Sequence, residues 1–227
     1  MNKRFEFKYI LDQHTALKIR DYLEKIPSLT LDPYAKKGFY IVNSLYFDTP
    51  QFDDYRNKDD SLLARKKLRA RIYEDQWSAN SNKIWLEVKD KYNMFINKER
   101  TPISSLVWKD PLQIPSSRFR YLYLRHNYKP LVIIKYQRLA YLDKLTYSVR
   151  VTFDKNIAVC KASDLLQQEF MTNVSGNQVV MEIKFQEKLP WWFTQAITKF
   201  NLRRDDFSKY RNSVAILRGL NRIPINK

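Results

Sequence analysis

The sequence predicts an α+β protein, mainly antiparallel β, in which about eight strands close into a barrel-shaped tunnel with a polar, basic interior and helices packed outside. Three observations support this fold class. Segments in which apolar and charged residues alternate recur along the chain, and a period of two is that of a strand with one buried face. The chain contains 15 Tyr, 13 Phe and 5 Trp, and aromatic residues favour strands. Amphipathic helical segments are available to cover an apolar exterior.

The alternating segments are the predicted strands. In chain order they cover residues 4–9, 39–47, 65–73, 83–91, a short stretch around 98–100, 131–140, 147–154 and 179–185. The pattern is clearest in the third of these, where three cations share one face and three apolar residues share the other: Lys67, Arg69 and Arg71 against Leu68, Ala70 and Ile72. Repeated like charge on one face costs self-repulsion, which a bound polyanion would relieve.

Helices are predicted between and after these strands. The first is capped by Asp12 or Thr15 and ends before Pro27, the second covers 117–124, the third follows Pro190 over 191–200, and the last has Ser208 as its N-cap. Residues 48–50 are expected to form a turn, and residues 78–82 a loop.

The chain is predicted to be a single domain over residues 1–227. Barrels and sandwiches of this length commonly form one domain, and no internal repeat or long linker divides the sequence. The 3 Gly are too few for a glycine-rich phosphate loop, so any bound phosphate is expected to contact side chains. A single Cys excludes an internal disulfide.

The net charge of +17 predicts an anionic partner. Charge alone leaves nucleic acid, polyphosphate, nucleotides and an acidic membrane surface open. No apolar run is long enough to span a membrane, and the N-terminus lacks the apolar centre of a signal peptide, so we expect a cytoplasmic protein.

The strand faces allow either a sandwich with its charges in water or a closed tunnel with its charges inside. Three features favour the tunnel. Carboxylates and lysines recur at i, i+2 spacing, as expected where carboxylates hold a metal and cations hold phosphate: Glu6/Lys8, Glu87/Lys89 and Glu182/Lys184. Helices are available to cover the apolar exterior. The charged faces also carry arginines, whose planar fork suits phosphate: Arg69, Arg71, Arg138 and Arg150.

Eight short motifs, in this order, resemble the VTC-type polyphosphate polymerase domain of the triphosphate tunnel metalloenzyme (CYTH-like) superfamily. They are Tyr46-Phe47-Asp48-Thr49-Pro50, Lys67-Leu68-Arg69-Ala70-Arg71, Leu86-Glu87-Val88-Lys89, Lys98-Glu99-Arg100, Tyr136-Gln137-Arg138-Leu139-Ala140, Val149-Arg150-Val151-Thr152-Phe153-Asp154, Met181-Glu182-Ile183-Lys184 and Ser208-Lys209-Tyr210. Each motif alone is weak, but together they cover almost the whole chain.

The resemblance implies an antiparallel eight-stranded tunnel that transfers the γ-phosphoryl group of ATP to a growing polyphosphate chain with Mn²⁺ or Mg²⁺. The residues that it implies for catalysis are Arg69, Arg71, Lys89, Arg138 and Arg150. Those that it implies for binding phosphate or nucleotide are Lys8, Lys67, Lys98, Tyr136, Lys184, Ser208 and Lys209. Glu182 is the expected metal ligand, with Glu6 and Glu87 as further candidates. ATP and polyphosphate are the expected partners, no nucleic acid is expected, and a membrane partner and the oligomeric state are left open.

Two other functions remain open from the residues. A tripolyphosphatase or nucleoside triphosphatase of the same fold would use water as the acceptor. Arg4 stands where hydrolases of the superfamily have a first carboxylate, which argues against a two-metal hydrolase. A non-catalytic module that binds polyphosphate or RNA is the third candidate, although RNA binders usually expose aromatic side chains for base stacking. Many aromatics here alternate onto the faces opposite the charges.

Overall fold

The computed structural model describes residues 4–35, 38–59, 63–77, 83–92, 95–103, 113–115, 117–144, 148–164, 168 and 170–219. The chain divides into two units, each discontinuous in sequence. Unit 1 comprises Met1–Tyr40, Tyr136–Ile157 and Ser175–Ser208, and unit 2 comprises Ile41–Lys135, Ala158–Val174 and Lys209–Lys227. The single domain over residues 1–227 stays a prediction.

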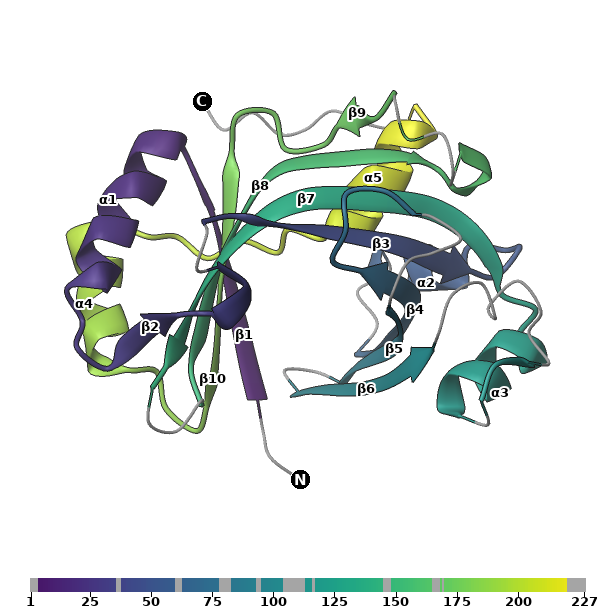
Figure 1. Cartoon of the computed structure of the whole chain (residues 1–227), viewed down its shortest axis with the longest axis horizontal. Helices are drawn as coiled ribbons and strands as arrows, with labels where there is room; N and C mark the ends of the chain where they lie inside the picture. The colour runs from purple at the N-terminus through teal and green to yellow at the C-terminus, as the bar shows by residue number, and fades with distance from the viewer. Residues whose placement is uncertain are drawn as a thin grey trace. The chain divides into compact units, whose positions relative to one another are not determined.

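The strands form a sheet in the order β1-β10-β8-β7-β3-β4-β5-β6, with β2 beside β7 and β9 beside β8 (Figure 1). Their bounds are β1 Arg4–Leu11, β2 Leu29–Leu31, β3 Tyr40–Asp48, β4 Ala64–Ile72, β5 Ile84–Tyr92, β6 Phe95–Ile103, β7 Lys129–Asp143, β8 Arg150–Lys161, β9 Thr172–Asn173 and β10 Val179–Gln186. The registers along β1-β10-β8 and along β3-β4-β5-β6 are antiparallel, which confirms the mainly antiparallel α+β prediction. The order has two ends, β1 and β6, so closure into a barrel stays a prediction.

The helices are α1 Gln13–Glu24, α2 Asp53–Asp59, α3 Arg118–Arg125, α4 Trp191–Lys199 and α5 Lys209–Leu217, and short 3-10 turns cover Pro33–Ala35 and Ala162–Asp164. The predicted helices are present, and Asp12 caps α1 by accepting a hydrogen bond from the Thr15 amide at 2.8 Å. The sequence analysis missed α2, β2 and β9, and it ended β8 too early. The predicted loop 78–82 lies outside the described residues.

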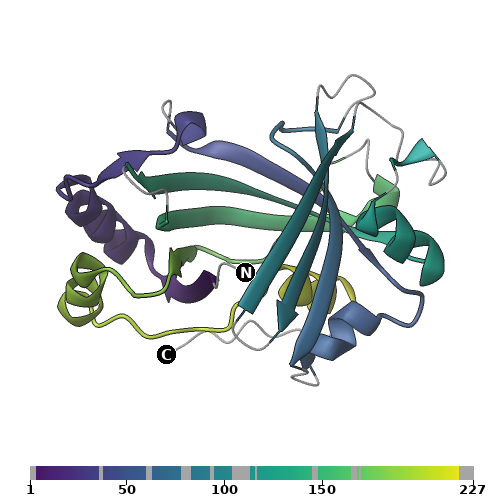
Figure 2. The same ribbon diagram turned by 90° about the horizontal axis from the view of Figure 1, so that it is seen from below.

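In unit 1, α1 and α4 cover the apolar face of the strands. Figures 1 and 2 both show the two helices side by side. The core joins Ile19 and Leu23 of α1 and Phe193 of α4 to apolar residues of β1, β8 and β10. The helices therefore pack on the face that the alternation predicted to be apolar, and the charged residues of these strands lie on the other face.

In unit 2, α3 takes the same role. Phe119 and Leu122 of α3 belong to one buried cluster with Leu68 and Ala70 of β4 and Leu86 of β5. Burial of alternate residues fixes the strand register, because a slip of one residue would turn the cations into the core. The charged face of β4, β5 and β6 is thus set by the packing beneath it.

A buried carboxylate joins β3, α2 and α5 within unit 2. Asp48, the last residue of β3, accepts hydrogen bonds from the amides of Thr49 at 2.7 Å, Asp54 at 3.0 Å and Tyr55 at 3.1 Å. It also accepts a short hydrogen bond from the hydroxyl of Tyr210 on α5. The turn predicted at residues 48–50 is present, closed by the hydrogen bond from the Phe52 amide to the Thr49 carbonyl at 2.9 Å, and it leads into α2, whose first turn this carboxylate caps.

Asp54 lies in the same buried region. Its Oδ2 accepts a hydrogen bond from the Tyr128 hydroxyl at 2.9 Å, and its Oδ1 lies 4.0 Å from the Lys66 ammonium without a hydrogen-bond partner. Burial and the nearby charge of Asp48 raise the pKa of Asp54 from 3.8 to about 7.

We expect Asp54 to make stability fall with rising pH. Between the ordinary pKa of 3.8 and about 7, folded Asp54 holds a proton that the unfolded chain has lost, so stability declines through this window and is lowest above it. Asp54→Asn cannot ionise. Its free energy of unfolding in urea, relative to wild type, should rise by about 1–3 kcal/mol between pH 5 and pH 8. Asp21→Asn, on the exposed face of α1, is the control; identical pH dependence in wild type and Asp54→Asn would contradict the assignment.

Candidate functional site

The candidate site in unit 2 is a group of five charged residues that we call the Glu87 cluster: Arg69, Arg71, Glu87, Lys98 and Arg100. The alternation of β4, β5 and β6 places them on one face of the sheet. Arg69, Glu87 and Arg100 are direct cross-strand neighbours, in the register Arg69↔Glu87 and Glu87↔Arg100. Cross-strand neighbours lie about 5 Å apart at Cβ, so their charged groups can meet.

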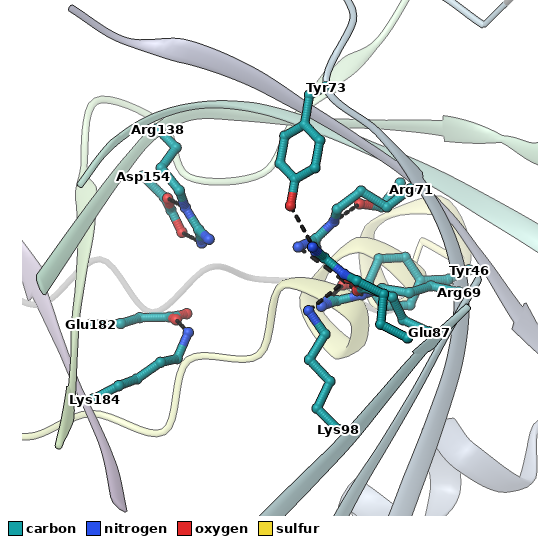
Figure 3. Close-up of polar contacts among 12 residues, drawn as sticks. Tyr46, Arg69, Arg71, Tyr73, Glu87, Lys98, Arg138, Asp154, Glu182 and Lys184 are labelled. Atoms are coloured by element: carbon teal, nitrogen blue, oxygen red, sulfur yellow. Dashed lines mark hydrogen bonds and ion pairs between the residues drawn. The ribbon is translucent and has the colours of Figure 1, made fainter. Parts of the chain in front are cut away.

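Glu87 is fully buried and is the centre of this cluster (Figure 3). Its Oε2 lies 2.5 Å from Arg69 Nε and 3.8 Å from Arg71 Nη1. Its Oε1 lies 2.6 Å from Lys98 Nζ and 2.6 Å from Arg100 Nη2. One carboxylate thus neutralises part of the charge of four cationic side chains.

This arrangement shifts the pKa of its members. Burial raises the pKa of Glu87, but the four cations outweigh burial and hold it well below its usual range. Burial and the charge of Arg69 lower the pKa of Lys98 more than Glu87 raises it. The three arginines alone outnumber the one carboxylate, so the cluster keeps an excess of positive charge, and an incoming anion would favour the protonated form of Lys98.

Tyrosines support the arginines of the cluster. Tyr46 accepts a hydrogen bond from Arg69 Nη1 at 2.9 Å, and Tyr73 accepts one from Arg100 Nη2 at 2.8 Å. Arg71 donates to Ser44 Oγ at 3.0 Å. Burial raises the pKa of Tyr46, but the charges of Arg69 and Arg71 lower it by more than burial raises it, so the pKa lies below its usual value. These contacts hold the guanidinium groups in one orientation.

Other predicted phosphate ligands lie beside the cluster in unit 2. Lys67, Lys89 and Lys98 form the next row of cross-strand neighbours. The Lys67 ammonium lies 5.3 Å from the ring centroid of Tyr210, which itself stacks on Tyr46 at 5.2 Å. Lys209 is the first residue of α5, directly before Tyr210.

In unit 1, Arg138 and Asp154 form a buried bidentate ion pair. Arg138 Nε donates to Asp154 Oδ1 at 2.6 Å, and Nη2 donates to Oδ2 at 2.7 Å (Figure 3). The Arg138 guanidinium also lies 5.2 Å from the ring centroid of buried Tyr136. Burial lowers the pKa of Arg138, but Asp154 raises it more, well above its usual value. Arg138 is thus permanently charged.

Unit 1 also brings four predicted residues together on β1 and β10. Glu6 is the cross-strand neighbour of Lys184, and Lys8 that of Glu182. Lys184 Nζ lies 3.1 Å from Glu182 Oε2 and 3.9 Å from Glu6 Oε2, so one cation lies between the two carboxylates. Lys8 Nζ lies 3.6 Å from Glu6 Oε1 and donates to the Phe207 carbonyl at 2.7 Å.

Arg150 lies on β8 and binds Asp32, in the segment before β3, and Tyr40, the first residue of β3. Its Nη2 donates to Asp32 Oδ2 at 2.6 Å and to the Tyr40 hydroxyl at 3.0 Å. Its Nε is buried without a hydrogen-bond partner, so the guanidinium retains a donor for another group. Ser208, the remaining predicted residue, is buried directly before α5, where an N-cap was expected.

The carboxylates of unit 1 fit a divalent cation that is held by two carboxylates and by phosphate oxygens of the substrate. In the described part of the chain, no group of three or more His, Cys, Asp or Glu is placed to hold a metal. Glu6 and Glu182 nevertheless lie close enough to share the ammonium of Lys184. Mg²⁺ is commonly held by one or two carboxylates plus substrate phosphates, and Mn²⁺ also takes oxygen ligands.

Sequence reasoning missed four polar partners: Arg100, Tyr73, Asp32 and Asp154. Arg100 had a signal, because it alternates onto the same face as Lys98. Asp154 had one as well, because it alternates onto the same face as Arg150. Asp32 had none, since 118 positions separate it from Arg150 in sequence. Strand alternation identifies the face of a residue but not the partner that meets it.

Removal of the Glu87 charge is expected to destabilise unit 2. Glu87→Gln leaves buried Arg71, partly buried Arg69 and exposed Lys98 and Arg100 without their counter-ion. The loss should cost about 2–3 kcal/mol, less than for a fully buried pair, because water screens the exposed cations. Added tripolyphosphate should raise the melting temperature of Glu87→Gln more than that of wild type, because a bound anion replaces the lost charge. Glu99→Gln is the control, since exposed Glu99 pairs only at the surface, 3.1 Å from Arg118. Equal melting temperatures of Glu87→Gln and wild type without anion would refute this role of Glu87.

Solved structures share the fold of this chain, and two of them are candidate adenylate cyclases. One is a candidate adenylate cyclase from Bacillus halodurans, with a TM-score of 0.55 and 12% identity over 91% of this chain and 94% of that chain. The other is a candidate adenylate cyclase from Vibrio parahaemolyticus, with a TM-score of 0.53 and 14% identity over 93% of this chain and 97% of that chain. At these identities the likeness concerns the fold alone.

No curated protein sequence matches the chain. None of the helices in the described residues is both long enough and apolar enough to cross a membrane. The family model of the VTC domain, however, matches residues 3–218 and confirms the resemblance found in the motifs. The match spans nearly the whole sequence, and the chain therefore belongs to the VTC domain family.

Proposed function

We propose that this protein is a polyphosphate polymerase that transfers the γ-phosphoryl group of ATP to the end of a polyphosphate chain. The observation that supports the proposal most strongly is the Glu87 cluster, in which one buried carboxylate holds four cationic side chains on one strand face. The closed eight-stranded tunnel and the cytoplasmic location predicted from the sequence are part of the proposal.

The chemistry of phosphoryl transfer suits such a cluster. A terminal oxygen of the polyphosphate chain bonds to the γ-phosphorus of ATP, and the bond from this phosphorus to the β–γ bridging oxygen breaks. ADP leaves with the electron pair, and the chain gains one phosphate. Little covalent chemistry is required of the protein, because the reaction depends on positioning and on neutralising the charge of the transferring group.

The ion pairs of the cluster can be exchanged for phosphate. Arg69 and Arg71 present planar guanidinium groups that bind two phosphate oxygens at once, whereas Lys98 acts as a point charge. The exchange loses ion pairs with Glu87 but relieves the repulsion among cations that a single carboxylate leaves in place. We assign Lys67 and Lys89, in the next row, to neighbouring phosphates of the same chain.

The predicted residues of unit 1 are a second set of proposed phosphate ligands. Arg138, Arg150, Lys8 and Lys184 are expected to bind phosphate, with Tyr136 and Ser208 of unit 1 and Lys209 of unit 2 as further contacts of the substrate. Arg150 carries the clearest structural support in unit 1, because its buried Nε is unpaired. Polyphosphate and ATP are the proposed partners; nucleic acid is not.

Glu182 and Glu6 are the proposed ligands of Mg²⁺ or Mn²⁺. A bound divalent ion would neutralise phosphate charge and lower the repulsion between donor and acceptor. When the divalent ion binds, Lys184 would leave the two carboxylates and bind phosphate instead. Glu87 is a weaker candidate for a metal, because its two oxygens already face four cations.

Product analysis tests the proposal directly. Purified protein is incubated with ATP and Mn²⁺, polyphosphate is detected by gel staining, and ADP and free phosphate are measured. The proposal predicts polymer together with ADP. ADP with free phosphate and no polymer would replace it with a triphosphatase, and no turnover would leave a binding module.

Turnover should depend more on the planar geometry of the arginines in the Glu87 cluster than on their charge. Arg69→Lys and Arg71→Lys keep the charge but lose the fork that binds two oxygens, so each should lower turnover by about 10²- to 10³-fold with little change in melting temperature. The matched control is Arg118→Lys, because Arg118 also forms a forked ion pair, with Asp90, but at the surface. Similar turnover in all three variants would mean that the charges act only as a diffuse field.

Glu182 should control the metal requirement. Glu182→Gln keeps the size of the side chain but removes a charged ligand, so turnover should need at least about tenfold more Mn²⁺ or disappear. Metal-free binding of tripolyphosphate should persist or strengthen, since one negative charge is removed. Glu99→Gln serves again as a surface control. An unchanged Mn²⁺ dependence in Glu182→Gln would remove this residue from the metal site.

A further inference from the structure

Trp85 lies on the charged face of β5 rather than in the core. It alternates with Leu86 and Val88, which are buried in the apolar cluster of unit 2, and so shares its face with Glu87 and Lys89. Trp85 itself is partly exposed. A large aromatic ring on a face of cations gains little from core packing, which raises the question of what covers it.

Two cations now lie against the ring. The Arg100 guanidinium and the Lys83 ammonium are each 4.5 Å from the centroid of the Trp85 ring. Arg100 is held in place by Glu87 at 2.8 Å and by the Tyr73 hydroxyl at 2.8 Å. Lys83 is exposed and precedes β5. The contact with Lys83 is therefore the one that a ligand can replace.

The cross-strand rows show which charged groups follow Trp85 along the strands. From Trp85 along the strands, the rows are Arg71–Trp85–Pro102, then Arg69–Glu87–Arg100, then Lys67–Lys89–Lys98. Lys89 lies four positions after Trp85, which is about 13 Å along a strand. This span is comparable with that of an extended nucleoside triphosphate, from its base to its γ-phosphate.

We propose that Trp85 is the platform on which the base of a nucleoside triphosphate stacks. The inference rests on the proposed function and adds to it the orientation of the nucleotide. With the base on Trp85, the phosphates follow the arginines of the Glu87 cluster, and the γ-phosphate reaches the row of lysines 67, 89 and 98. The growing polyphosphate chain meets ATP at that row.

The interaction energies favour replacement of the Lys83 ammonium by a nucleotide base on the Trp85 ring. A cation over an aromatic ring at an exposed site contributes about 0.5–1 kcal/mol. Stacking of a base on an aromatic side chain contributes about 1–3 kcal/mol. A base that displaces Lys83 therefore gains more than the lysine loses, and Arg100 remains beside the stack as a further cation.

The experiment compares two ligands that differ in the nucleoside. ATP and inorganic tripolyphosphate are titrated by calorimetry into wild type, Trp85→Leu, Trp85→Phe and Trp191→Leu. Trp191, on α4 in unit 1, is also an exposed tryptophan and serves as the matched control. Melting temperatures show that each variant is folded.

Trp85→Leu is expected to weaken ATP binding about tenfold while leaving tripolyphosphate binding unchanged. Trp85→Phe, which retains an aromatic face, should recover part of the loss, and Trp191→Leu should match wild type. An equal loss of both ligands in Trp85→Leu, or no loss of either, would overturn the platform while leaving the proposed function intact. A wild-type protein that binds neither ATP nor tripolyphosphate would overturn both.

Discussion

The buried carboxylate of Glu87 is the interaction on which the rest of unit 2 depends. Four cations from β4 and β6, the two strands beside β5, approach within 4 Å of it, and without it they would repel one another. The apolar residues beneath, such as Leu68 and Leu86, prevent these strands from slipping in register. Packing on one face and charge on the other therefore specify the same register.

Carboxylates hold most of the candidate phosphate ligands in this structure. Asp154 holds Arg138, Asp32 holds Arg150, and Glu182 holds Lys184, just as Glu87 holds its cations. This arrangement stabilises a strongly basic protein without substrate and orients its cations for an anion. Stability and binding are then linked, because a bound polyphosphate would take over contacts that carboxylates make in its absence.

Alternation in the sequence predicted the strands, the faces of their charges and the helices that cover their apolar sides. It succeeded for Arg69, Arg71 and Lys98 because a period of two reports the face directly. It could not predict that Arg138 meets Asp154, since pairing across the sheet depends on register. It also missed α2, whose cap by Asp48 forms only in the fold. Trp85 was not recognised as part of the charged face, because a tryptophan in an alternating strand is usually a core residue.

The central claim is that the cations around Glu87 bind the phosphates of the substrate. A crystal structure with a non-hydrolysable ATP analogue tests this most directly. The account predicts phosphate oxygens within hydrogen-bond distance of Arg69, Arg71 and Lys98, with longer distances from these groups to Glu87 than the 2.5 Å and 2.6 Å found for Arg69 and Lys98. An analogue bound elsewhere, with all four ion pairs of Glu87 intact, would contradict it.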